Sequence, residues 1–208
     1  ETLLEDGSMV NKGDIALRVS GKAQAILTAE RLVLNCMQRM SGIATYTHRL
    51  NTLIAGTGAH LLDTRKTTPN FRICEKWAVA IGGGTNHRYG LFDMVMLKDN
   101  HIDFAGGIEA AISSVKHYLV QKEKSLRIEV ETRNLQEVQE VLRVGGVDVI
   151  MLDNMSPQLM REAVSLIGDT CETEASGGIT EETIRQVAET GVDYISVGAL
   201  THSALPLD

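Results

Sequence analysis

Short apolar runs of β-strand character alternate with helical patterns from His60 to the end of this chain. The six runs are His60–Asp63, Met94–Leu97, Leu126–Glu131, Val149–Leu152, Thr173–Ala175 and Tyr194–Val197. Helical patterns lie between them, near residues 71–81, 108–119, 135–144, 157–167 and 181–190. This alternation predicts a parallel sheet with right-handed crossovers. Most runs lack polar alternation, which is typical of strands covered on both faces.

The length of the alternating region decides which α/β fold is expected. A closed eight-unit barrel takes about 250 residues, whereas only about 150 follow Asn51 and they hold six runs. We therefore predict an incomplete, open α/β barrel of six or seven parallel strands. An open doubly wound sheet is the alternative fold.

The first 50 residues have a different pattern. Turn signals at Asp6-Gly7 and Lys12-Gly13 separate short apolar pieces, as in the last strands of a small sheet. From Lys22 to Leu50 apolar residues recur at helical spacing, and we expect the helix to break or bend at Gly42. We predict a remnant of an N-terminal α/β domain with its connecting helix in 1–50, and a catalytic barrel domain in 51–208.

Composition excludes several classes of protein. Hydrophobic residues make up 43% of the chain, enough for a sizeable core, and no apolar run approaches the ~20 residues of a membrane helix. The net charge of −7 and the pI near 5.4 argue against a nucleic-acid surface. Three isolated cysteines suggest no disulfide framework, and no targeting segment is recognisable. We expect a cytoplasmic protein.

Polar residues or glycines follow every predicted strand. In chain order these are Asp63-Thr64-Arg65-Lys66, Lys98-Asp99-Asn100-His101, Glu131, Asp153-Asn154, Ser176-Gly177-Gly178 and Gly198-Ala199. In a barrel of parallel strands these ends meet on one face, which is the face that holds active sites. Six such ends together describe a pocket.

The last two strand ends and the acidic pair indicate a phosphate compound with a metal ion. Glycine turns after the final strands, at 176–178 and 198–199, are the usual phosphate site of such barrels. Glu131 and Asp153 end adjacent strands, and two carboxylates beside a phosphate suit Mg²⁺. The alternative is that one carboxylate simply pairs with Lys98 or Arg65.

Five cationic or potentially cationic side chains follow the first two runs, although the chain as a whole is acidic. They are Arg65, Lys66, His87, Arg88 and Lys98. Gathered in one pocket they would repel one another, so the pattern predicts a small, highly anionic ligand. His87 could instead be a structural histidine. Arg39 lies off the apolar stripe of its helix and by itself indicates a solvated arginine.

Several segments closely resemble one enzyme family, quinolinate phosphoribosyltransferase, also called nicotinate-nucleotide pyrophosphorylase (carboxylating). The resemblance runs from about Asp6 to the C-terminus. It rests on the motifs ERLVLNCMQRMSGIATYT, DTRKTTP, NHRYGL, VMLKDNHI, EVET, IMLDN and EASGGIT. Several of these motifs are long and carry charges at specific places, which makes chance improbable. Most of the family's N-terminal domain has no counterpart in this chain.

The resemblance implies a small N-terminal domain, an open barrel, and a dimer or an assembly of dimers. It implies transfer of phosphoribose from phosphoribosyl pyrophosphate to quinolinate with Mg²⁺, which gives nicotinate mononucleotide, pyrophosphate and CO₂ in NAD synthesis. The family's quinolinate contacts match Arg65, Lys66, His87, Arg88 and Lys98, with Arg39 supplied by the neighbouring subunit. Its catalytic and metal-binding acids match Glu131 and Asp153, and Lys66 and Lys98 assist pyrophosphate departure. Its phosphate turns match Ser176, Gly177, Gly178, Gly198 and Ala199.

Three alternatives remain at this stage. A related phosphoribosyltransferase could act on nicotinate or another acidic heterocycle, although one carboxylate needs fewer cations. A non-catalytic sensor of phosphoribosyl pyrophosphate would not need the acidic pair. An unrelated phosphate-binding barrel, such as an isomerase, would need a base at a strand end, and none is convincingly placed.

Overall fold

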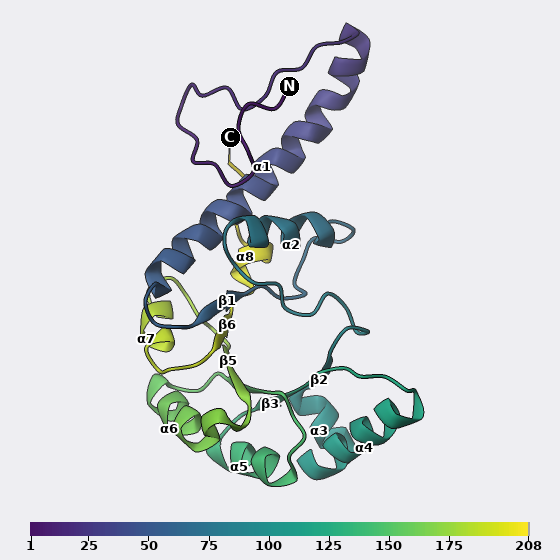
Figure 1. The fold of residues 1–208 in the computed structure, drawn as a ribbon, viewed down its shortest axis with the longest axis vertical. Coiled ribbons are helices and arrows are strands. Elements are labelled where there is room, and N and C mark those ends of the chain that lie inside the picture. The colour runs from purple at the N-terminus through teal and green to yellow at the C-terminus, as the bar shows by residue number, and fades with distance from the viewer. Residues whose placement is uncertain (208) are drawn as a thin grey trace.

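The structure, a computed structural model that describes residues 1–207, contains one open sheet of six parallel strands (Figure 1). The strands are β1 (His60–Leu62), β2 (Val95–Leu97), β3 (Ile128–Thr132), β4 (Val149–Asp153), β5 (Glu172–Ser176) and β6 (Tyr194–Ser196). Their order is β1-β6-β5-β4-β3-β2, and each neighbouring pair is parallel. The two edge strands β1 and β2 do not pair, so the predicted incomplete barrel is confirmed.

A single residue extends the sheet beyond β1. Thr85 donates its N–H to the carbonyl of Leu61, and its own carbonyl accepts the N–H of Asp63. The segment that leads to His87 therefore enters beside β1 in a parallel direction, as a rudimentary seventh strand. This contact brings a segment from the α2–β2 connection to the open side of the barrel.

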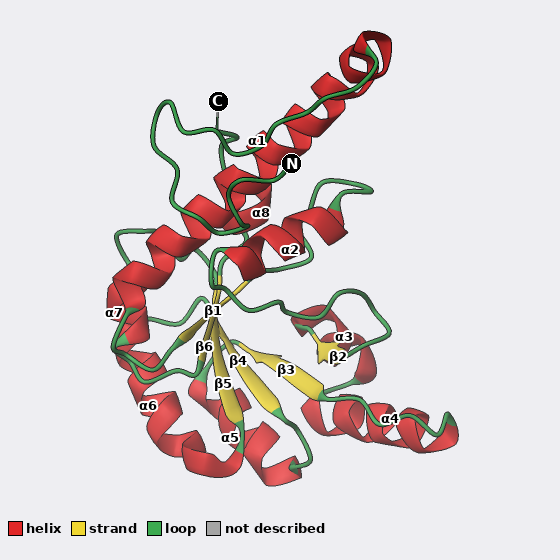
Figure 2. Ribbon diagram, turned by 45° about the horizontal axis from the view of Figure 1, so that its top comes forward, coloured by secondary structure: helices red, strands yellow, loops and turns green. Residues whose placement is uncertain are grey.

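Helices cover the outer side of the sheet, as Figure 2 shows. They are α2 (Arg72–Ile81), α3 (Asp99–Ala105), α4 (Ile108–Gln121), α5 (Leu135–Val144), α6 (Pro157–Ile167), α7 (Ile184–Ala188) and α8 (Ala199–His202), with a 3-10 turn at Gly168–Thr170. The five predicted helical patterns are all present. The short helices α3 and α8 were not predicted, because each lies in a segment interpreted as a strand-end loop.

The long helix α1 (Ala23–Ile54) runs without interruption past Gly42, so the expected break is wrong. A Cβ at Gly42 would lie 2.0 Å from the carbonyl oxygen of Leu205. The glycine therefore allows the C-terminal segment to cross the helix at close range, and its role is packing rather than bending.

The first 22 residues form no regular strand within the described chain. A single antiparallel bridge joins Thr2 to Leu17, and the segment lies along the outer half of α1 (Figure 1). Apolar side chains there remain open to solvent, with Leu27 71% and Leu32 70% exposed. Because α1 continues through residue 50, the division of the chain at 50/51 stays a prediction.

The core lies between the sheet and its outer helices. Fully buried residues include Val130, Ile150, Leu152 and Ile195 of the strands, and helix residues such as Ile112. Within residues 1–207 no helix combines the length and the apolar character needed to cross a bilayer.

Candidate active site

Parallel pairing aligns the carboxyl ends of the strands on one edge of the sheet. In the register of the sheet Glu131 lies opposite Met151, and Asp153 opposite Ser176. The predicted polar strand ends therefore follow neighbouring strands in space as well as in sequence. This edge is where α/β barrels bind their ligands.

Arg65 and Arg88 form a cationic pair that lacks a direct carboxylate partner. Burial and the charge of Arg65 lower the pKa of Arg88, in that order. Within residues 1–207 no carboxylate forms an ion pair with either guanidinium, and the Nε of Arg65 is buried without a hydrogen-bond partner. Two close guanidiniums with unused donors favour a multivalent anionic ligand.

Each of the two predicted lysines lies beside another part of the predicted site. A Cβ at Gly198 would be 3.1 Å from the Cδ of Lys66, and the carbonyl of Lys66 accepts the hydroxyl of Thr201 at 2.8 Å. The Nζ of Lys98 lies 3.8 Å from a carboxylate oxygen of Glu131 and is about half exposed. Thus Lys66 lies beside the last glycine turn, and Lys98 lies beside Glu131.

The turn after β5 depends on glycine. Gly177 has φ +90, and a Cβ there would lie 2.3 Å from the Oδ1 of Asn154, which follows β4. A side chain at this position would push the β4 and β5 ends apart. The regular helix α7 begins only at Ile184, three residues after the start of the helical pattern predicted near residues 181–190. The main chain of the turn, rather than a helix terminus, lies at the strand end.

At the next turn, Gly198 immediately precedes α8, and Ala199 is the first residue of that helix. The predicted glycine turn is therefore a tight entry into a helical turn. Hydrogen bonds from the N–H groups of Thr201 and His202 to the carbonyl of Gly198 close it.

The acidic pair fits a hard divalent cation. Burial raises the pKa of Glu131, and the charges of Asp153 and Asp99 raise it further, against the N–H of Asp99 and the charge of Lys98. The two carboxylates repel one another across adjacent strand ends, which a cation would relieve. The contact of Glu131 with Lys98 means that the predicted alternative, a simple pairing with lysine, also has structural support.

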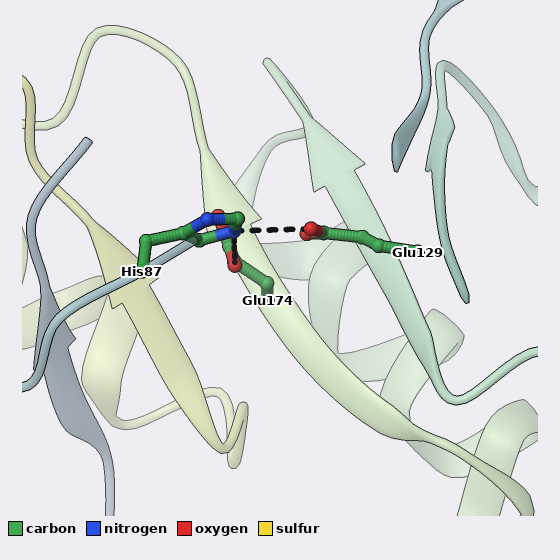
Figure 3. Close-up of side chains that lie close together, drawn as sticks. All are labelled: His87, Glu129 and Glu174. Atoms are coloured by element: carbon green, nitrogen blue, oxygen red, sulfur yellow. Dashed lines mark ion pairs between the residues drawn. The ribbon is translucent and has the colours of Figure 1, made fainter. Parts of the chain in front are cut away.

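His87 points toward Glu129 and Glu174, with which it forms a buried cluster (Figure 3). Its Nε2 lies 3.0 Å from an oxygen of Glu129 and 3.2 Å from an oxygen of Glu174. The imidazole is only 7% exposed. The structural role considered for His87 therefore has direct support, whereas the contact with quinolinate stays a proposal.

The His87 cluster has the donor types of a metal site, but its hydrogen bonding favours a proton. The N–H of Arg88 donates to the Nδ1 of His87 at 2.7 Å, which occupies the Nδ1 lone pair. In that tautomer Nε2 carries the hydrogen and cannot bind a cation. Although the three ligand atoms lie within 4.8 Å of one another, we assign no metal here.

The protonation of this cluster is a balance of opposing effects. Burial lowers the pKa of His87, whereas contact with both glutamates raises it. Burial, assisted by the charge of Glu174, raises the pKa of Glu129 to about 7, against the contact with His87. The Arg88 N–H on Nδ1 opposes a second proton on the ring, so we describe His87 as a neutral Nε2–H donor facing two carboxylates that repel one another.

Helix α2 carries three side chains that sequence reasoning missed. Arg72 donates to the carbonyls of Arg65 and Tyr89, and Lys76 contacts both Asp63 and the carbonyl of His87. Glu75 binds the segment after Arg65. Their spacing of three and four places all three on one helix face, which was a usable signal.

Arg39 is held by contacts to three other segments of the chain. Its guanidinium binds Glu75 and the carbonyls of Thr201 and Ala204. It is therefore not the solvated arginine first indicated, and its sharing with a neighbouring subunit stays a prediction.

Comparison with known proteins decides the family. The model described as "Quinolinate phosphoribosyl transferase, C-terminal domain" matches residues 43–208, and the corresponding N-terminal domain model matches residues 1–41. The chain belongs to the quinolinate phosphoribosyltransferase family. The predicted resemblance is thus confirmed at the level of family and fold.

Individual relatives agree with this assignment. The chain is 50% identical to quinolinate phosphoribosyltransferase [decarboxylating] 1b of Nicotiana tabacum, over 100% of this chain and 63% of that protein. It is 44% identical to a probable nicotinate-nucleotide pyrophosphorylase [carboxylating] of Bacillus subtilis, over 98% of this chain and 69% of the relative. The crystal structure of NadC from Streptococcus pyogenes superposes with a TM-score of 0.92 at 41% identity, covering 99% and 70% of the two chains. The chain thus spans less than two thirds of the tobacco relative.

Proposed function

We propose that this protein transfers phosphoribose from phosphoribosyl pyrophosphate to quinolinate and decarboxylates the product to nicotinate mononucleotide. Membership of the family supports this reaction. The observation that carries it is the cationic pair Arg65 and Arg88 on the sheet edge where the glycine turns and the acidic pair also lie. The negative charges of a diacid and a sugar phosphate together balance the positive charges of these arginines.

In the proposed complex the cationic side chains bind the two carboxylates of quinolinate. Arg65 and Arg88 offer planar, two-pronged donors, and Lys98 offers a mobile point charge. Lys66 serves the phosphate side, next to Gly198. Fixing both carboxylates aims the ring nitrogen at the anomeric carbon of the ribose, which can supply a large part of the rate enhancement.

The chemistry then proceeds by two bond exchanges. The ring nitrogen forms a bond to the anomeric carbon as the bond to pyrophosphate breaks, and pyrophosphate leaves with the bonding electrons. Glu131 and Asp153 stabilise the positive charge that develops on the ribose. The nitrogen is now cationic, so the adjacent carboxylate departs as CO₂ and leaves its electron pair on the ring carbon, which takes a proton.

Glu131 and Asp153 are also the residues that would hold Mg²⁺. Their mutual repulsion and their position beside the phosphate turns fit a cation that binds few carboxylates. When bound, the ion would neutralise charge on the departing pyrophosphate. Lys98, already close to Glu131, supplies a positive charge on the same side.

Release of labelled CO₂ from carboxyl-labelled quinolinate by the complete protein tests the reaction. We expect one CO₂ per nicotinate mononucleotide, and only when phosphoribosyl pyrophosphate is present. Binding of phosphoribosyl pyrophosphate without CO₂ release would overturn the proposal in favour of a sensor. Equal thermal stabilisation by quinolinate and nicotinate would overturn the diacid specificity.

A homodimer, or a higher assembly of dimers, belongs to the same proposal. Its support in this chain is the exposed apolar surface along the outer half of α1, where Leu27, Leu32 and Val33 face solvent. The expected sharing of Arg39 across the interface has no such support, because its guanidinium donors already bind Glu75 and the carbonyl of Ala204. Sedimentation of the wild type and of Leu32→Glu checks the assembly, with a monomer expected for the variant.

A cytoplasmic location also remains a proposal. The relatives do not decide it, because the names of two plant relatives give chloroplastic or mitochondrial locations. Fractionation of the source cells with an antibody to the protein would test it.

A further inference from the structure

An ion pair between Arg39 and Glu75 lies directly behind the predicted substrate loops. The Nε and Nη2 of Arg39 are 3.0 Å and 2.9 Å from the Oε1 of Glu75. Glu75 is fully buried, and the Arg39 side chain is 23% exposed. Both donors therefore converge on one oxygen of a buried carboxylate, as charge-assisted hydrogen bonds.

The same carboxylate binds the loop that carries two of the predicted substrate contacts. Glu75 accepts the N–H of Thr68 at 2.9 Å and the hydroxyl of Thr68 at 2.8 Å. Thr68 follows Arg65 and Lys66 in the chain, so the position of this carboxylate sets where the loop ends. The Glu75 side chain therefore holds the end of the Arg65 loop, and Arg39 in turn holds Glu75 in place.

Arg39 also reaches the other side of the site. It donates to the carbonyl of Thr201 in α8, and to the carbonyl of Ala204 just beyond it. Helix α8 begins immediately after Gly198, the last predicted phosphate turn. One guanidinium thus joins α1, the Arg65 loop and the helix after the phosphate turn.

From these contacts we propose that Arg39 acts in its own subunit as a positioning residue, which holds the Arg65 loop in register with the Gly198 turn through Glu75. This inference rests on the proposed function, since it assigns the loop to quinolinate and the turn to phosphate. Without Arg39 the buried Glu75 would lose its counter-ion, and the loop would lose its fixed end. Arg39 touches neither reacting group in this arrangement.

Mixed dimers distinguish action in one subunit from action across the interface. Arg39→Ala and Lys98→Ala are each expected to be strongly impaired. If Arg39 served the neighbouring site, a random mixture would recover about a quarter of wild-type activity, because half the dimers would hold one intact site. We expect no recovery, and recovery to that level in verified mixed dimers would overturn the inference.

Kinetic constants of single variants test the positioning role itself. Arg39→Ala should raise KM for quinolinate about tenfold, the scale of a lost charge-assisted contact, with a smaller change in kcat. Thr68→Val cuts the side-chain link at the loop and leaves the ion pair intact, so it should raise the same KM less. The two effects should not add in the double variant, because both act through Glu75.

The control is Arg49→Ala, which removes another α1 arginine, one that pairs with Glu181 and not with Glu75. It should leave KM unchanged. An unchanged KM in Thr68→Val would contradict the inference even if Arg39→Ala fails to fold. Where Arg39→Ala folds, additive effects in the double variant would also contradict it. A wild type that releases no CO₂ would instead contradict the proposed function.

Discussion

Two buried ionic clusters lie beside the predicted site residues, and they differ in how many of their polar atoms have hydrogen-bond partners. In the Arg39 cluster, Glu75 accepts four hydrogen bonds from Arg39 and Thr68. In the His87 cluster, the contacts to Nε2 lack hydrogen-bond direction, and both oxygens of Glu129 are without hydrogen-bond partners within residues 1–207.

The difference shows two uses of buried charge. A cluster whose polar atoms all have hydrogen-bond partners fixes the geometry of the elements that it joins. A cluster with unpartnered polar atoms lowers stability and is retained only where function needs it. The Arg39 cluster joins three elements beside the predicted site residues. In the His87 cluster, Glu129 partly offsets the charge of Arg88.

The largest effect is expected when the satisfied cluster is broken. Glu75→Ala should lower the free energy of unfolding by about 3 kcal/mol, the low end for a broken buried pair, because Arg39 is partly exposed. Urea denaturation measures this. As a control, Glu109→Ala removes an exposed partner of Arg143 and should leave the midpoint unchanged. A similar loss in both variants would remove the distinction.

The cations above the His87 cluster should matter for binding rather than for folding. Arg65→Ala and Arg88→Ala should each weaken quinolinate binding by about 1.5–3 kcal/mol, the range for a hydrogen bond to a charged group. Titration calorimetry measures the affinity, and thermal melting should show no matching loss of stability. Unchanged affinity in both variants would take these residues out of the pocket.

The same substitution applied to each cluster should have opposite consequences. Glu174→Gln removes a buried, poorly satisfied charge at constant shape and should leave the protein equally stable or more stable, by up to about 1 kcal/mol. Glu75→Gln should instead destabilise, since an amide cannot accept all four donors. Parallel urea titrations compare them. Equal destabilisation by both variants would mean that the clusters do not differ as described.

The pH dependence of stability should be the smallest effect, and it tests which proton the His87 cluster holds. An imidazolium with a pKa of about 9, raised above the unfolded value of 6.5, would stabilise the fold at low pH. That contribution would be lost as pH rises through 9. Because Nδ1 accepts the N–H of Arg88, we expect a neutral ring and no such loss. Unfolding of wild type and His87→Gln from pH 6.5 to 9.5 checks this, and a loss confined to wild type would reverse the assignment.

Sequence patterns located all six strands and six of the α-helices, since hydrophobic periodicity reflects burial directly. They also located the strand-end residues, because parallel strands bring their carboxyl ends to one edge. They failed at Gly42, which was expected to break the helix. The structure instead shows that the C-terminal segment crosses α1 at close range there. They also failed to find Glu174, whose single carboxylate inside a buried strand carries no periodic signal.

By itself, therefore, the order of residues determined the family, the open parallel sheet and the edge at which polar groups collect. The partners of the charged side chains were decided only by the tertiary structure. Arg39 and Glu75 are 36 positions apart and His87 and Glu174 are 87 apart, so no local spacing announces either contact. Charge pairing depends on distance and burial in three dimensions, and the folded sheet sets both.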